Sequence, residues 1–174
     1  MKKTFLLSLL FALVSTMAIW AQQTPETASN DFTYTTTATA TNGKMHFTSA
    51  KLYYKAPANT MRFSLKESGA YYKNGKNRLS FDSFELFNSK GEKVSLSAAD
   101  FSGNYNKPYA YMLDGNNDTY CCGSWSANDE GHDYFEIELA TDLGGSFSFS
   151  FITENTTMNP KAFRIELQNK ETEV

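Results

Sequence analysis

Residues Phe147-Ser148-Phe149-Ser150-Phe151 alternate aromatic rings with hydroxyl side chains, and this alternation decides the fold class. Neighbouring side chains of a β-strand point to opposite faces of a sheet, so the three rings share one face. A face of this kind fits the core between two packed sheets better than an exposed platform for sugars. We therefore expect a strand at 147–151 with its rings buried against a second sheet.

The same period of two recurs on both sides of this stretch, for example at 61–65, 135–139 and 163–167. Glycine-containing turn signals separate these runs, namely Asn42-Gly43, Ser89-Lys90-Gly91 and Gly144-Gly145. No comparable helical period is present, apart from one short turn expected at 96–101. About eight short strands with turns between them predict an all-β fold, an antiparallel sandwich or barrel.

Residues 1–21 have the pattern of an export signal. Lys2 and Lys3 precede an apolar run at 5–14, which is too short to span a bilayer, and Ala21 ends an acceptable cleavage site. The alternative, an N-terminal membrane anchor, lacks the expected basic flank. We expect the mature protein to be secreted or periplasmic, with a strand segment at 22–51, a sandwich at 52–168 and a short polar tail at 169–174.

Composition excludes some classes of function. The formal net charge of −3 becomes more negative once the two signal lysines are removed, which argues against a nucleic-acid or anionic-membrane surface. The only two cysteines, Cys121 and Cys122, are adjacent in the chain, so an ordinary intrachain disulfide between them is geometrically poor. We expect two small buried thiols, with intermolecular pairing or metal capture as the alternatives.

Catalytic patterns are weak. His132 and Asp133 could join a cysteine in a nucleophilic arrangement, but no spacing supports it. Glu136 and Glu138 share one strand face, which is more typical of a solvated surface than of an acid and base pair. No phosphate-binding glycine loop or metalloprotease helix motif is present. The sequence predicts a protein that is not an enzyme.

Residues Leu113-Asp114-Gly115-Asn116-Asn117-Asp118-Thr119 form an oxygen-rich turn. Such a turn can bind its own backbone as an Asx turn, or it can hold a hard cation. An EF-hand is excluded, because its glycine and glutamate positions carry Thr119 and Trp125. The two remaining interpretations are a metal-free Asx turn and a structural Ca²⁺ site. The calcium ligands would be turn carbonyls and side chains from the following set: Asp114, Asn117, Thr119 and the distant Glu166.

This turn, followed by Ser124-Trp125 and by Tyr134-Phe135-Glu136-Ile137-Glu138-Leu139, resembles the discoidin, or coagulation factor 5/8 type C, pattern. The later strands at 147–153 and 163–165, and the earlier pair at 62–65 and 84–87, are also similar to that family. The resemblance covers about 52–168.

The resemblance implies a galactose-binding-domain-like jelly-roll sandwich, similar to family 32 carbohydrate-binding modules. Such domains often bind glycans, sometimes hold a structural calcium ion, and are usually not catalytic. The chain lacks the disulfide that clamps the ends of many members, and Glu154 stands where an arginine is common. Trp125 follows the family turn and is expected to plug the core rather than to bind sugar.

A carbohydrate binder should present rings for the faces of sugars and polar groups for their hydroxyls. The loops supply the following candidate ligand-binding residues: Tyr71, Tyr72, Asn74, Arg78, Tyr105, Tyr109, Glu154 and Asn155. We therefore expect a domain that binds a glycan or glycoconjugate. The alternative is a structural or protein-interaction subunit of a bacterial envelope assembly.

Overall fold

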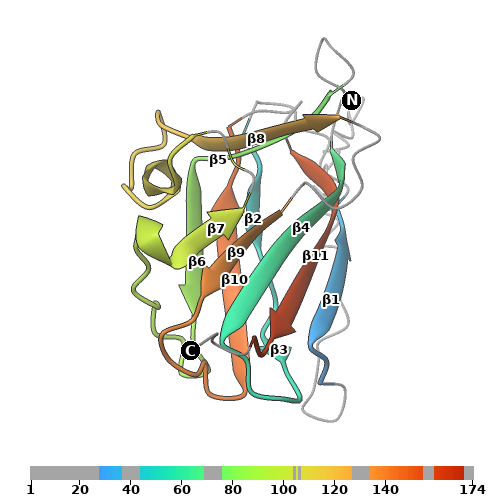
Figure 1. Ribbon diagram of the computed structural model, residues 1–174, viewed down its shortest axis with the longest axis vertical. Helices are drawn as coiled ribbons and strands as arrows, with labels where there is room; N and C mark the ends of the chain where they lie inside the picture. Colours follow the sequence, from blue (N-terminus) through green and yellow to red (C-terminus); the bar gives the residue numbers. More distant parts are fainter. Residues whose placement is uncertain are drawn as a thin grey trace, which may run out of the picture.

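The computed structural model describes residues 28–36, 44–68, 76–103, 105, 107–126, 134–154 and 159–170. Figure 1 shows two layers of strands with a further strand pair across one end. The larger sheet has the order β1-β11-β4-β9-β7. Its strands are β1 (Asp31–Thr35), β11 (Pro160–Gln168), β4 (Thr60–Ser68), β9 (Tyr134–Glu138) and β7 (Phe101–Gly103).

The second sheet is built around β10 (Ser146–Ile152), the strand predicted from the Phe and Ser alternation. On one side β10 pairs with β2 (His46–Thr48) and β3 (Leu52–Tyr53), and on the other with β6 (Ser83–Phe87). Strands β1 and β2 both come from the 22–51 segment, and they lie in different sheets. This N-terminal segment therefore contributes a strand to each layer.

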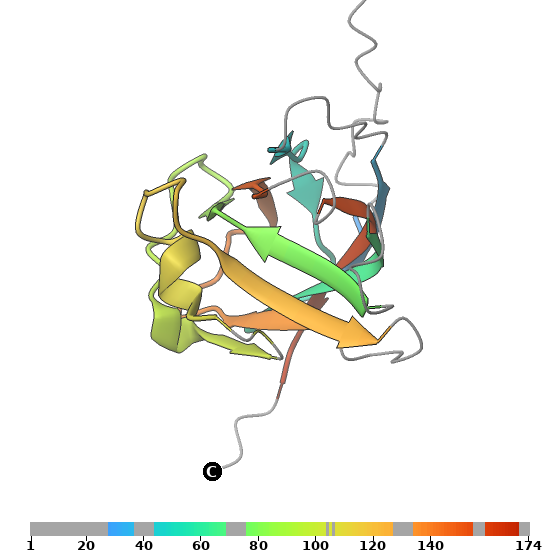
Figure 2. The same ribbon diagram turned by 90° about the horizontal axis from the view of Figure 1, so that it is seen from above.

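The strand pair at one end consists of β5 (Lys76–Phe81) and β8 (Cys121–Ser126). Figure 2 shows from above how these two strands cross the end of the sandwich. Phe81 of β5 points into the core, where its ring lies 5.2 Å from that of Phe63 and 5.1 Å from that of Phe151. The pair thus closes the core at this end.

All described strand pairings are antiparallel. The prediction of an all-β antiparallel sandwich is therefore confirmed. The finer galactose-binding-like jelly-roll topology stays a prediction.

The core is aromatic because alternate residues of both sheets face inward. Phe147, Phe149 and Phe151 of β10 are at most 1% exposed, so their prediction as core residues is confirmed. The ring of Phe63 on β4 stacks on Phe135 at 5.2 Å and on Phe163 at 5.0 Å. It meets Phe151 of the opposite sheet edge-on, at 87° and 6.0 Å. Stacked pairs within a sheet and edge-to-face pairs between sheets are the favoured geometries for aromatic rings.

The outer face of the larger sheet carries charges in register across its strands. Arg62 lies opposite Glu136 on β9, and its guanidinium is 2.6 Å from that carboxylate. Lys170 binds the other oxygen of Glu136. Glu138 is exposed as expected, but Glu136 is only 8% exposed, so the expectation of a solvated surface is wrong for Glu136. Burial acts to raise the pKa of Glu136, but hydrogen bonds from Lys170 and Arg62 hold it below its ordinary value.

Two short 3₁₀ turns lie between strands in the described part of the chain. The first, η2 (Ala98–Asp100), begins after Ser97, whose amide and hydroxyl both donate to the Asp100 carboxylate, and it confirms the short turn predicted at 96–101. The second, η3 (Tyr109–Met112), precedes the Asp114 turn. Within the described ranges no helix has the length and apolar character needed to cross a bilayer. The predicted signal at 1–21 lies outside these ranges.

Candidate binding site

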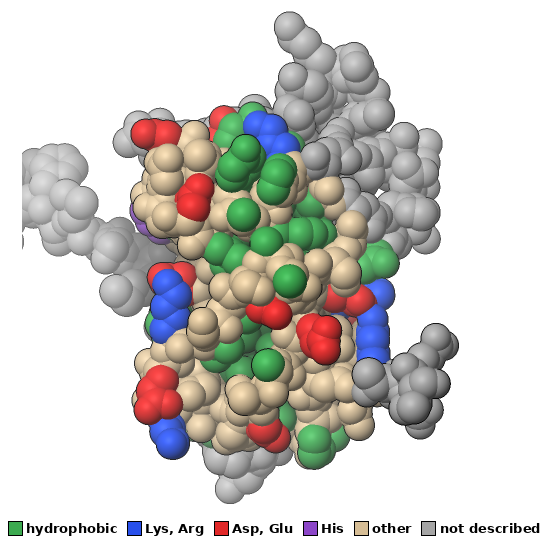
Figure 3. All heavy atoms as spheres, turned by 60° about the vertical axis from the view of Figure 1, so that its left-hand side comes forward, with side chains coloured by type: hydrophobic (Ala, Val, Ile, Leu, Met, Phe, Trp, Pro, Cys, Tyr) green, Lys and Arg blue, Asp and Glu red, His purple; other side chains and the backbone are tan. Residues whose placement is uncertain are grey.

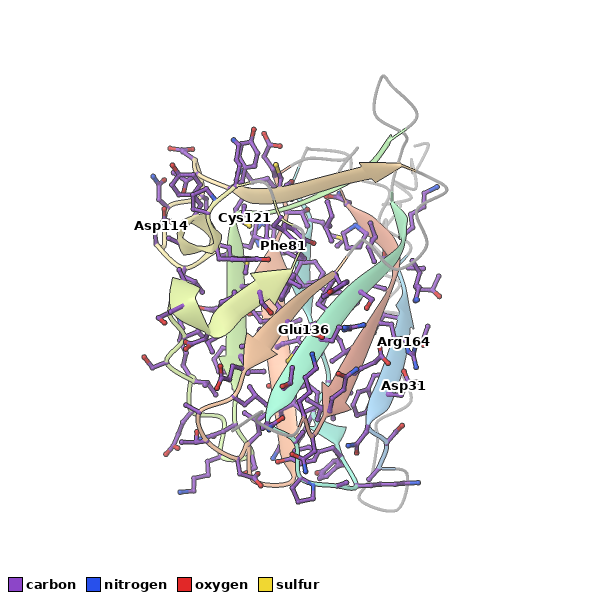
Figure 4. All side chains as sticks on the ribbon, in the orientation of Figure 1. Asp31, Phe81, Asp114, Cys121, Glu136 and Arg164 are labelled. Atoms are coloured by element: carbon purple, nitrogen blue, oxygen red, sulfur yellow. The ribbon has the colours of Figure 1, made fainter. Side chains whose placement is uncertain are left out.

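The Asp114 turn lies at the end of the sandwich that β5 and β8 close, between η3 and β8 (Figure 4). The Asp114 carboxylate accepts hydrogen bonds from the Asn116 amide at 2.8 Å and from the Thr119 hydroxyl at 2.7 Å. Gly115 has a φ of +72°, a backbone conformation that glycine adopts without strain. Hydrogen bonds from Thr119 and Asn116 lower the pKa of Asp114. The turn therefore has the Asx-turn geometry, in which both carboxylate oxygens are used locally.

The predicted calcium ligands do not come together. Glu166 lies on β11 opposite Asp31, and Arg164 bridges its carboxylate at 3.2 Å. Figure 4 places Asp31 and Arg164 on the opposite side of the molecule from Asp114. Among the described residues, no group of three or more His, Cys, Asp or Glu side chains could hold a metal ion. Glu166 therefore cannot complete a site at the turn, and the predicted ligand set does not fit calcium.

The other two predicted ligands remain in the turn. Thr119 binds Asp114, and the Asn117 carbonyl oxygen accepts a hydrogen bond from the ammonium of Lys44. Lys44 also forms an ion pair with Asp82, which lies between β5 and β6. Sequence reasoning missed this pair, because 38 residues separate its members.

Tyr105 and Tyr109 point inward rather than toward a ligand. The Tyr105 ring lies 5.6 Å from that of Phe135, and the Tyr109 ring stacks on Phe101 at 5.2 Å. Burial raises the pKa of Tyr109 to about 12. Both rings extend the core at this end, so the prediction that they bind ligand as exposed rings is not supported by their placement. The Phe135 ring that would have revealed this lies on β9, which is distant in the chain from both tyrosines.

Glu154 lies within electrostatic reach of Lys107, whose ammonium is 3.6 Å from the centroid of the Tyr120 ring. The interaction with Tyr120, followed by the charges of Cys122 and Glu154, raises the pKa of Lys107. Glu154 thus belongs to a small polar and aromatic cluster at the loop end. Tyr120, which sequence reasoning also missed, is the half-buried ring of that cluster.

Several predicted residues cannot be placed. Tyr71, Tyr72, Asn74, Asn155, His132 and Asp133 lie outside the described residues. Arg78 pairs with Ser124 and Trp125 pairs with Asn77 through their backbones on β5 and β8. The side chains of Arg78 and Trp125 lie outside the described part of the structure.

The two cysteines are buried on β8, as predicted. The Cys121 thiol donates to the Lys107 carbonyl at 3.3 Å, and burial raises its pKa to about 12. A thiol in that state is not a nucleophile at neutral pH. This geometry argues against Cys121 as the reactive group in a cysteine and histidine arrangement.

A groove of about 340 Å³ separates β6 from the Asp114 turn. Its lining combines hydroxyl and charged groups with apolar side chains, from Ser83, Phe84, Glu85, Lys93, Val94, Ser95, Leu96, Met112, Leu113 and Gly115. Figure 3 shows this side of the molecule, where hydrophobic side chains lie among carboxylates and lysines. The groove is amphipathic, and it adjoins the turn that carries the family resemblance.

Glu85 and Lys93 form the charged pair of the groove. The Lys93 ammonium is 2.8 Å from one Glu85 oxygen, and the Ser150 hydroxyl donates to the other at 3.2 Å. The hydrogen bond from Lys93 holds the pKa of Glu85 below its ordinary value, against the effect of burial. Glu85 is therefore an ionised acceptor in a fixed orientation, with a donor beside it. The Glu85 carboxylate can accept a hydrogen bond from a ligand hydroxyl, and the Lys93 ammonium can donate one to a ligand hydroxyl.

No family model, no curated protein and no solved structure matches this chain. The resemblance to discoidin domains therefore stays a prediction.

Proposed function

We propose that this protein is an exported, non-catalytic domain that binds carbohydrate in the groove between β6 and the Asp114 turn. The observation that carries the proposal is the groove itself, in which the Glu85 and Lys93 pair stands beside apolar side chains. Sugars present the same combination, with hydroxyls around each ring and apolar C–H faces. A concave site with a few convergent polar groups is the usual form of a small-ligand site.

Export is proposed from the sequence pattern at 1–21. The non-catalytic role is proposed from the weak catalytic patterns, together with the buried state of Cys121. The Lys107, Tyr120 and Glu154 cluster would extend the ligand surface at the same end.

The test is calorimetric titration and a glycan array with the mature protein, with and without calcium. The matched variants are Glu85→Gln with Lys93→Met in the groove, and Asp31→Asn with Arg164→Met as a control. The control also removes a partly exposed ion pair between β1 and β11, together with the weaker contact of Arg164 with Glu166. We expect the groove variant to lose about 10- to 100-fold in affinity, because two charge-assisted hydrogen bonds are lost. Absence of binding to any glycan, or a groove variant with the same affinity as the wild type, would contradict the proposal.

A second candidate function is binding of an extended peptide, in line with a protein-interaction subunit. The Val94 amide donates to the Leu86 carbonyl at 2.8 Å, which shows that Leu86 directs its backbone away from β10. Alternate residues of a strand share this direction, so the Phe84 backbone faces the groove. An added strand could pair there. Co-purification of a stoichiometric protein partner would favour this candidate over carbohydrate.

A further inference from the structure

The Asp82 carboxylate is buried at the end of the sandwich. Asp82 is 0% exposed, and its amide donates to the Ile152 carbonyl at 2.8 Å, which fixes it against β10. Its Oδ2 accepts a hydrogen bond from Lys44, whereas its Oδ1 has no hydrogen-bond partner among the described residues. An ionised carboxylate in such a place is stable only beside a cation.

Lys44 supplies that cation from a fixed position. The next residue, Met45, donates its amide to the Thr153 hydroxyl at 3.1 Å and accepts from the Thr153 amide at 3.0 Å. The Lys44 ammonium lies 2.5 Å from Asp82 Oδ2 and 2.5 Å from the Asn117 carbonyl oxygen. One ammonium thus joins three segments: the start of β2, the start of β6 and the Asp114 turn.

The groups around this ammonium are those that hard cations prefer. They are the Asp82 carboxylate, whose Oδ2 contacts the ammonium, and the Asn117 carbonyl oxygen. The charge of Asp118 acts to raise the pKa of Asp82, so this carboxylate lies within electrostatic reach of the site. Burial is the main cause of that raised pKa, and Lys44 and His46 oppose it. The only positive charges that face Asp82 from the described elements are therefore Lys44 and, when protonated, His46.

We propose that the Lys44 ammonium is the resident cation of an oxygen site formed by Asp82 and the Asp114 turn, and that this site binds a divalent cation once Lys44 is removed. The site differs from the calcium site expected from the sequence, because its carboxylate is Asp82 rather than Glu166. The ammonium is part of the chain, so the site is occupied without binding an ion from solution. Its positive charge also repels a metal ion. The wild-type protein is then stable without calcium. The proposal is independent of carbohydrate binding.

The test compares melting temperatures in EDTA and in millimolar CaCl₂, together with Tb³⁺ luminescence. The variants are Lys44→Met and Lys44→Ala, each alone and combined with Asp82→Asn. The matched control is Lys51→Met, because the Lys51 ammonium also donates to a backbone carbonyl, that of Ser89, at 2.8 Å. Lys51 faces no described buried carboxylate.

We expect the wild type and Lys51→Met to melt at the same temperature in both buffers and to give no Tb³⁺ signal. Lys44→Met and Lys44→Ala should melt lower in EDTA and recover by about 2–6 °C in calcium, with a Tb³⁺ signal. Adding Asp82→Asn should abolish both responses.

A wild type that calcium stabilises and EDTA destabilises would overturn the proposal, because a metal would then be resident beside Lys44. Folded Lys44 variants without a cation response would also overturn it. So would Lys44 variants that stay unfolded in calcium, since the metal would have failed to replace the ammonium. Because each readout reports stability or metal binding, loss of glycan binding alone leaves the outcome unchanged.

Discussion

The middle of the sandwich and its closed end are stabilised in different ways. In the middle, Phe63 contacts rings on its own sheet and on the facing one, so each contact is one of many. At the closed end, the Asp114 turn depends on a few short-range hydrogen bonds and on the single ammonium of Lys44. We therefore expect loss of a polar contact in the Asp114 turn to act locally, and loss of a core ring to lower the stability of the whole sandwich.

This difference separates stability from recognition. Apolar packing is non-directional and adds up over many neighbours, while a polar turn holds one geometry through specific donors and acceptors. A sandwich of this kind can vary the loops at its end while the packed layers keep the fold. Substitutions in the two regions should then have effects of different size and kind.

The largest effect is expected in the middle. Phe63→Ala should lower the free energy of unfolding by about 3–5 kcal/mol, because it leaves a cavity where several rings now touch. Urea denaturation measures the change, and Thr33→Ala on the exposed face of β1 is the control, with less than about 0.5 kcal/mol. A loss below about 1 kcal/mol for Phe63→Ala would mean that the ring is not in the core.

A smaller effect is expected on the outer face of the same sheet. Glu136→Gln should cost about 1–3 kcal/mol near neutral pH, because Arg62 and Lys170 lose their shared carboxylate. Folding holds the pKa of Glu136 below its ordinary value of 4.5, so the unfolded chain binds the proton first as the pH falls. The stabilisation is present above about pH 5 and is lost as the pH falls through the folded-state pKa. Melting curves of both proteins from pH 3 to 7 should converge in acid, and a constant difference would contradict this account.

At the closed end, Asp114→Ala should act locally. The amide of Asn116 and the hydroxyl of Thr119 lose their acceptor, so amide hydrogen exchange at 116–119 should become faster, while exchange in β4 and β10 stays the same. The shift in melting temperature should be smaller than that of Glu136→Gln. Faster exchange throughout the core would show that the turn and the sandwich unfold as one unit.

The smallest effect on stability is expected in the groove. Lys93→Met removes a partly exposed ion pair with Glu85, and such pairs contribute about 0.2–1 kcal/mol, less at high salt. Chemical denaturation at low and high ionic strength measures it. A larger loss would indicate that the pair holds β6 in place, and carbohydrate binding could then not be tested separately from folding.

Sequence reasoning succeeded where structure depends on local pattern. The alternation of Phe147, Phe149 and Phe151 is enough to predict a buried strand face, and the spacing of Asp114 and Thr119 is enough to predict an Asx turn as one of two alternatives. Both inferences use only the geometry of neighbouring residues.

Sequence reasoning failed for contacts that depend on the order of the strands in the sheets. Glu166 was paired with Asp114 in the predicted site, but β11 lies beside β1 and β4, which carries Glu166 to the opposite side. Tyr105 was predicted on a ligand surface, but its ring meets Phe135 of β9. The Lys44 and Asp82 pair depends on the meeting of β2, β6 and β10, which periodicity cannot reveal.

The adjacent thiols of Cys121 and Cys122 also have a consequence for handling the protein. Burial shields both sulfur atoms in the native state. Because Cys121 and Cys122 are neighbours in one strand, the geometry is poor for a disulfide between them. Heating would uncover two oxidisable groups at once, and chains unfolded together in air would crosslink to one another. Reversibility of thermal melting should therefore depend on a reductant, whereas the reductant should have no effect on the native protein.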